Sequence, residues 1–126
     1  MKKSLALVVA AVVVVAALGA VAFFVLRGDG ESRATGVCGP ATSWELSAED
    51  EDGSTEVAFE MLSAGPDERW TVEVVQGDDV LLEGERATDE DAELDLDVVA
   101  RDGGSSTFTV TATPAEGDAC VATLER

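Results

Sequence analysis

The residues best placed to do chemistry in this 126-residue chain are carboxylates that cluster at two points. Positions 49–52 read EDED before Gly53, and positions 89–91 read DED. Hard cations such as Ca²⁺ bind clustered carboxylate oxygens. An EF-hand loop does not fit, because placing Gly53 at its sixth position puts Ala48 first and Phe59 last. We therefore expect either solvated turns or a calcium ion that bridges the two loops. The candidate ligands are Asp50, Asp52, Asp89 and Asp91.

Most other site chemistry is excluded by the residues that the chain lacks. It has no His, so Ser-His-Asp and Cys-His nucleophiles and His-ligated zinc are absent. Its only lysines, Lys2 and Lys3, precede the long apolar segment, and it has neither a Gly-x-Gly-x-x-Gly motif nor a P-loop. We expect a protein that is not an enzyme, has no cofactor apart from the calcium considered above, and shows no evident small-molecule substrate.

The charge is concentrated in one part of the chain. All 26 acidic residues follow position 27, together with five arginines, so that part carries 5 − 26 = −21. Such a surface repels phosphate backbones, which excludes nucleic acid as a partner, and it favours cations and basic proteins. Asn, Ile and Tyr, whose codons are AT-rich, are absent, which indicates a GC-rich bacterial or halophilic genome, so proteome composition is the alternative explanation of the acidity.

An apolar segment at the start predicts a membrane anchor. Leu5 to Leu26 is 22 residues of Leu, Ala, Val, Phe and one Gly, enough for a helix of about 33 Å. Lysines precede it and acids dominate after it, so we expect a cytoplasmic N-terminus and an extracytoplasmic remainder in the cell membrane. A cleaved signal peptide is the alternative, since Ala20-Val21-Ala22 suits a signal peptidase. We favour the retained anchor, because the apolar segment exceeds the usual 7–15 residues and cleavage would leave four large apolar residues first.

The rest of the chain divides into a tether and one domain. We expect a signal anchor at residues 1–27, a flexible polar tether at 28–37 and a domain at 38–126. From position 42 onward apolar residues recur at every second position, which is the period of a β-strand. Turn-forming Gly, Pro and Asp separate the segments, which predicts seven antiparallel strands in two packed sheets. The expected strands are 43–46, 56–61, 70–74, 80–82, 93–98, 107–112 and 120–124.

Two cysteines lie near the ends of this domain. Cys38 precedes the first expected strand and Cys120 lies in the last. Exported domains fold in an oxidising environment, where an even number of cysteines usually pairs. We expect a Cys38–Cys120 disulfide, and an intermolecular bridge or a redox pair are the alternatives.

With seven alternating strands and Trp70 in the third, the domain resembles an immunoglobulin-like or fibronectin-type β-sandwich. It is also similar to small single-pass surface proteins of GC-rich Gram-positive bacteria. The cysteine positions depart from antibody domains, and the lack of Tyr excludes a tyrosine corner. The resemblance implies a non-catalytic binding module for another envelope protein, or a spacer. A passive structural protein and a calcium-binding surface domain are the alternative functions.

Overall fold

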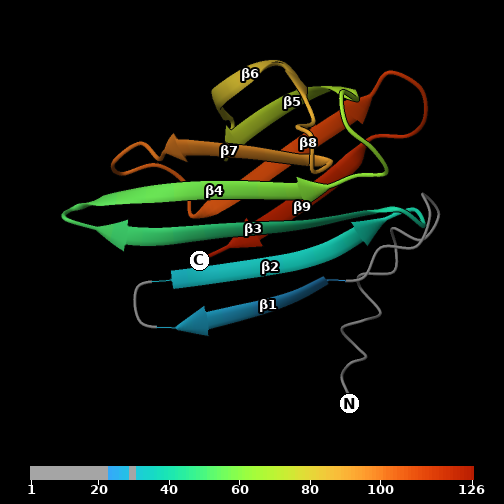
Figure 1. Cartoon of the computed structure of the whole chain (residues 1–126). Helices are drawn as coiled ribbons and strands as arrows, with labels where there is room; N and C mark the ends of the chain where they lie inside the picture. The colour runs from blue at the N-terminus through green and yellow to red at the C-terminus, as the bar shows by residue number, and fades with distance from the viewer. Residues whose placement is uncertain (1–22, 29–30) are drawn as a thin grey trace.

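The fold is an all-β sandwich of two antiparallel sheets (Figure 1). The computed structural model describes residues 23–28, as backbone, and residues 31–126. The described part contains strands and turns but no helix. Its strands are β1 (Phe23–Gly28), β2 (Glu31–Cys38), β3 (Thr42–Glu51), β4 (Ser54–Leu62), β5 (Arg69–Gln76), β6 (Asp79–Ala87), β7 (Glu93–Val99), β8 (Thr107–Pro114) and β9 (Cys120–Glu125).

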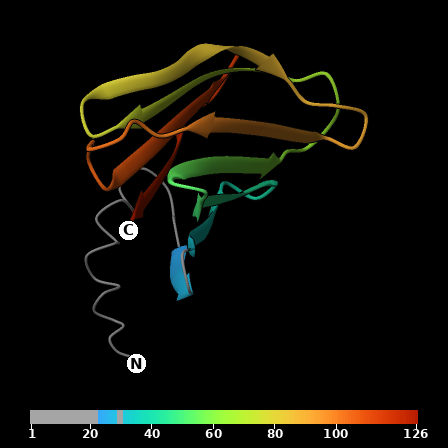
Figure 2. The same cartoon turned by 90° about the vertical axis from the view of Figure 1, so that its left-hand side faces the viewer.

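The two sheets exchange strands along the chain. One sheet has the order β1-β2-β3-β4-β7, and the other has the order β6-β5-β8-β9. The chain therefore crosses from one sheet to the other after β4, returns after β6 and crosses again after β7. Figure 2 shows that β1, at one edge of the larger sheet, lies far from the β5–β6 pair of the smaller sheet.

The core forms where the inward residues of both sheets meet, because successive side chains on a strand point to opposite faces. In β3, Trp44, Leu46 and Ala48 are buried while their neighbours are half-buried or exposed. The same alternation in β8 buries Phe108 and Val110 from the other sheet. The two inner faces share one continuous apolar cluster.

All seven strands expected from the periodicity are present as β3 to β9. The segment expected to be a flexible tether differs, because residues 31–38 form β2, and Ala34 at its centre has 0% of its surface exposed. This strand pairs with β3 along its whole length. The sandwich therefore begins before position 38.

The expected membrane anchor lies mostly outside the described residues. Leu5 and the sequence up to Ala22 are not described, while the last four residues of the predicted span, including Leu26, belong to β1 and pair with β2. A search of the described residues found no helix both long and apolar enough to span a bilayer.

Candidate functional site

The outer face of the larger sheet carries a regular array of acids. The register aligns sixteen outward positions of β2, β3, β4 and β7 in four rows, one residue from each strand. Eight of the sixteen are Asp or Glu, and Arg33 is the one basic residue among them. The rows are Glu31, Glu49, Glu56, Val99; Arg33, Ser47, Ala58, Asp97; Thr35, Glu45, Glu60, Asp95; and Val37, Ser43, Leu62, Glu93. We call this surface the acidic face.

Within the acidic face, carboxylates lie directly opposite one another. Glu45 pairs with Glu60, which pairs with Asp95, and neighbouring strands are only about 4.8 Å apart. Like charges directly opposite on a sheet destabilise it. Arg33 compensates part of the charge through ion pairs with Glu31 at 3.0 Å and Glu45 at 2.8 Å. Within the described residues, neither Glu60 nor Asp95 forms an ion pair, so this part of the face stays strongly negative.

The opposite outer face has a different composition. The eleven outward positions of β5, β8 and β9 hold six threonines and only two acids. Three further acids on the edge strand β6, Asp79, Glu83 and Glu85, are exposed. With these three included, the outer surface of the smaller sheet carries 2 + 3 = 5 acids, against eight on the acidic face.

The first pair of calcium candidates belongs to the β3–β4 hairpin. Asp50 accepts a hydrogen bond from Thr55 Oγ1 at 2.6 Å and forms an ion pair with Arg126. These contacts, the hydrogen bond first, hold the pKa of the Asp50 carboxyl below its usual 3.8. Asp52 lies in the turn itself, where φ is positive. Asp50 is therefore already occupied by contacts within the protein.

The second pair lies in the β6–β7 loop. Asp89 Oδ1 accepts hydrogen bonds from the backbone N–H groups of Asp91 and Glu93, so its side chain caps the loop. Asp89, Glu93 and Asp95 each offer an oxygen, and these oxygens lie within 4.8 Å of one another. Lost hydration and the nearby charges, chiefly Asp89 and then Asp95, raise the pKa of Glu93 above its usual 4.5.

A single ion cannot be held by both loops. The β3–β4 turn adjoins Ser54, whereas Glu93 pairs with Leu62 at the other end of β4. The eight residue steps between them span about 26 Å. Of the two alternatives for Asp50, Asp52, Asp89 and Asp91, the single bridging ion does not fit this distance. The structure brings Asp89 together with Glu93 and Asp95 instead. These two residues belong to β7, the strand that follows the acidic run at 89–91.

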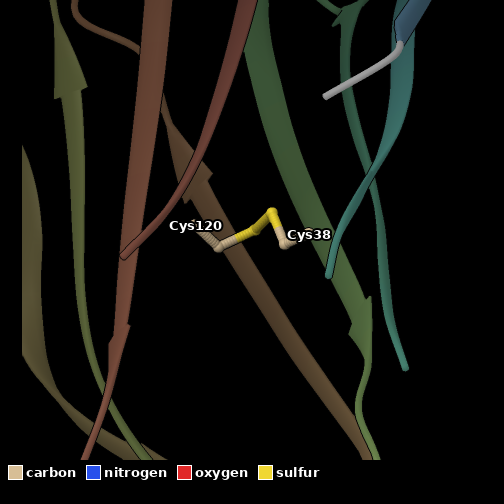
Figure 3. The surroundings of a disulfide bond; sticks show 2 residues. All are labelled: Cys38 and Cys120. Atoms are coloured by element: carbon tan, nitrogen blue, oxygen red, sulfur yellow. A yellow bond between two sulfur atoms is a disulfide. The ribbon is translucent and has the colours of Figure 1, made fainter. Parts of the chain in front are cut away.

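A disulfide closes one end of the sandwich, as expected. Cys38 ends β2 in the larger sheet and Cys120 begins β9 in the smaller one, with their Cα atoms 5.7 Å apart. Figure 3 shows the bridge crossing from one sheet to the other. Both cysteines are therefore used as a covalent clamp between sheets.

Next to the clamp is a pocket of about 940 Å³, which we call the end pocket. Three loops surround it, at residues 39–41, 63–68 and 115–119. Trp44 of the larger sheet, Trp70 of the smaller sheet and the disulfide also line it. Sequence reasoning missed this pocket, since its parts are distant along the chain.

Thr88 fixes one of these loops. Its side chain is buried, donates a hydrogen bond to the Gly65 carbonyl at 2.7 Å and accepts one from the Glu68 N–H at 2.9 Å. The backbone of Thr88 also donates to the Glu68 carbonyl. The 63–68 loop is thus held at Gly65 and at Glu68 against the residue that follows β6.

No protein-family model matches the chain, and the searches of curated proteins and of solved structures found no match either.

Proposed function

We propose that this chain is a membrane-tethered, extracytoplasmic and non-catalytic binding module that uses the acidic face to bind a basic protein of the cell envelope. The observation that carries the proposal is the row of Glu45, Glu60 and Asp95, where carboxylates oppose one another and the last two form no ion pair within the described part of the chain. A partner that brings Lys or Arg to this row would relieve the repulsion. Electrostatic complementarity of this kind gives specificity and fast association.

The immunoglobulin-like resemblance supports a binding module. The strand order is compatible with the Greek-key arrangement of such sandwiches. It groups β3-β4-β7 in one sheet and β6-β5-β8-β9 in the other, with three crossings between the sheets. Trp70 on the third of the seven expected strands is buried in the core, as the strand-C Trp of those domains is. We propose this fold family on the strand order and the position of Trp70.

The tether is supported by the apolar sequence before β1. Leu5 to Ala22 counts eighteen residues, or about 27 Å as a helix, which is within the range for a membrane span. Cleavage after Ala22 would instead make Phe23, the first residue of β1, the new N-terminus. We keep the anchor because eighteen apolar residues exceed a signal-peptide core. The intact mass of the native protein distinguishes the two, since cleavage removes residues 1–22.

Site-specific photocrosslinking in the native membrane tests the interaction. A photoreactive residue replacing Ser47, inside the acidic face, should capture a partner through a peptide rich in Lys and Arg. The same residue at Thr111, on the opposite face, is the matched control. Capture at Ser47 should fall at least fivefold in 0.5 M NaCl and in the E60Q/D95N variant, because screening and neutralisation remove the attraction. Equal capture from both faces, or none, would instead favour a passive structural protein.

Cation binding is a second candidate, favoured by the grouping of Asp89, Glu93 and Asp95. Carboxylate oxygens are the ligands that Ca²⁺ takes. If this group holds the ion, millimolar CaCl₂ should raise the thermal midpoint above that in NaCl of equal ionic strength. The extra rise should disappear in E93Q. Equal rises in both salts would mean charge screening.

A further inference from the structure

We propose that the end pocket binds an uncharged amphiphile: a molecule with an apolar chain and hydroxyl or carbonyl oxygens, drawn from the membrane surface. This ligand is supported by the lining of the pocket, two buried donors, the charge at its rim and the place where the chain enters the sandwich. The source of the ligand rests on the proposed tether, whereas the binding itself does not.

The interior of the pocket suits an apolar group. Two indoles from opposite sheets, the disulfide and Pro40 and Pro114 contribute to its lining. Its volume of about 940 Å³ is near the upper end of the range for small-molecule sites. Apolar pockets with a few polar groups are the usual form of such sites.

Two hydrogen-bond donors among the lining residues have no acceptor. Trp44 is 4% exposed and Trp70 is 6% exposed, and the indole N–H of each is buried without a partner among the described residues. Buried Trp N–H groups usually find an acceptor, because an unpaired buried donor destabilises the fold. A ligand with a carbonyl or hydroxyl oxygen would supply one once the atoms that cover these N–H groups move aside.

The rim of the pocket disfavours anions. Glu68, Glu116 and Asp118 contribute three carboxylates, against the one guanidinium of Arg69. Arg69 is also paired with Glu85 at 3.1 Å. A fatty acid or a phosphate headgroup would meet net negative charge here, so the oxygen-bearing end of the ligand should be uncharged.

The pocket lies at the end where the chain enters the sandwich. Phe23, the first residue of β1, pairs with Gly36, two residues before Cys38 of the pocket wall. The apolar sequence from Leu5 to Ala22 immediately precedes Phe23. If that sequence spans the bilayer, the pocket end of the sandwich lies against the lipid headgroups, and a membrane amphiphile needs to travel only a short distance to enter.

Tryptophan fluorescence tests the proposal directly, because Trp44 and Trp70 are the only tryptophans and the chain has no Tyr. The full chain is placed in phosphatidylcholine nanodiscs and titrated with a monoacylglycerol whose acyl chain carries bromine. Bromine quenches a nearby indole, so binding should quench at least half of the emission in a saturable way. The fatty acid with the same brominated chain should bind at least fivefold more weakly.

Two variants fill the pocket, and one serves as a control. A64F and A119F place a phenyl ring on the pocket wall and should abolish saturable quenching, and circular dichroism identifies which of them folds. S106F adds the same ring at the opposite end of β8 and should behave as the unmodified chain. If quenching does not saturate and is equal in the unmodified chain, A64F, A119F and S106F, it comes from collision with probe in the bilayer. That result would overturn the pocket.

The remaining outcomes separate the pocket from the tether and from the charge argument. If the chain proves to be cleaved after Ala22 and quenching is still saturable, the pocket is upheld and the membrane as the source of its ligand is overturned. Absence of quenching in an intact, anchored chain would overturn the pocket and leave the tether standing. Equal affinity for the fatty acid would overturn the assignment of an uncharged ligand.

Discussion

Thr88 is the residue whose loss should disturb the end pocket most without touching its lining. T88V keeps the shape but removes the hydroxyl, which leaves the Gly65 carbonyl and the Glu68 N–H without their partner. Unpaired buried groups cost about 1–3 kcal/mol each, so we expect the free energy of unfolding to fall by about 2–4 kcal/mol. Urea unfolding followed by circular dichroism measures this. T88S, which keeps the hydroxyl, should lose less than half as much, and equal losses would contradict the hydrogen-bond argument.

Glu93 should make the folded protein more stable as the pH is lowered, which is the opposite of the usual effect of a carboxylate. Its pKa is raised in the folded protein, so its charge destabilises the fold at pH values above the folded pKa. As the pH falls through the folded pKa toward 4.5, this residue should make the protein more stable. E93Q should therefore raise the thermal midpoint at pH 7 and have no such effect at pH 4.

Asp50 acts in the opposite direction and serves as the comparison. Its pKa is lowered, so its stabilising contribution is complete above 3.8 and is lost as the pH falls through the folded pKa. D50N should lower the midpoint at pH 7, and the difference from the unmodified chain should shrink as the pH falls below 3.8. If E93Q and D50N shift the midpoint in the same direction at pH 7, the assigned electrostatics are wrong.

These acids also show how far sequence reasoning reached at single residues. The acidic runs were visible, and Asp89 does take part in the oxygen group. Glu93 and Asp95 were missed because they alternate with apolar residues and were counted as outward strand positions. Their proximity to Asp89 depends on the cap that Asp89 forms over the loop, which no periodicity predicts.

Among the elements, the β3–β4 hairpin turns on two residues with positive φ, Asp52 at 51° and Gly53 at 86°. Asp-Gly suits such a two-residue turn, because Gly adopts positive φ without steric penalty. G53A should therefore lower the free energy of unfolding by about 1 kcal/mol. G65A is the matched control, since Gly65 has no positive φ and an added Cβ meets only ordinary contacts. A similar loss in both variants would contradict a conformational cause.

At the same scale, seven strands were predictable and two were not. The apolar alternation of β3 to β9 arises because each buries every second side chain in the shared core. β2 presents Ser32 and Ala34 to the interior, and residues this small give no apolar period. β1 was hidden because its apolar sequence continues the segment expected to span the membrane.

For the molecule as a whole, the disulfide is the largest single constraint on unfolding. Cys38 and Cys120 are 82 positions apart, and closing a loop of this length stabilises a fold by about 4–5 kcal/mol in the chain-entropy treatment. The C38S/C120S variant should lose about that much in urea unfolding. Reducing agent should destabilise the unmodified chain similarly and leave the variant unchanged. A loss below about 1 kcal/mol would show that the reduced chain keeps compact structure.

The same bridge determines how the protein responds to being pulled between its two ends. A force applied at Phe23 and Arg126 reaches the disulfide through β2 on one side and β9 on the other, and bypasses everything between Cys38 and Cys120. Only residues 23–37 and 121–126 can be drawn out, 15 + 6 = 21 residues or about 70 Å of extension. Optical tweezers should record that short extension, and about 360 Å once the bridge is reduced. A load that draws out β2 and β9 would thus leave the segment from β3 to β8 closed by the covalent link.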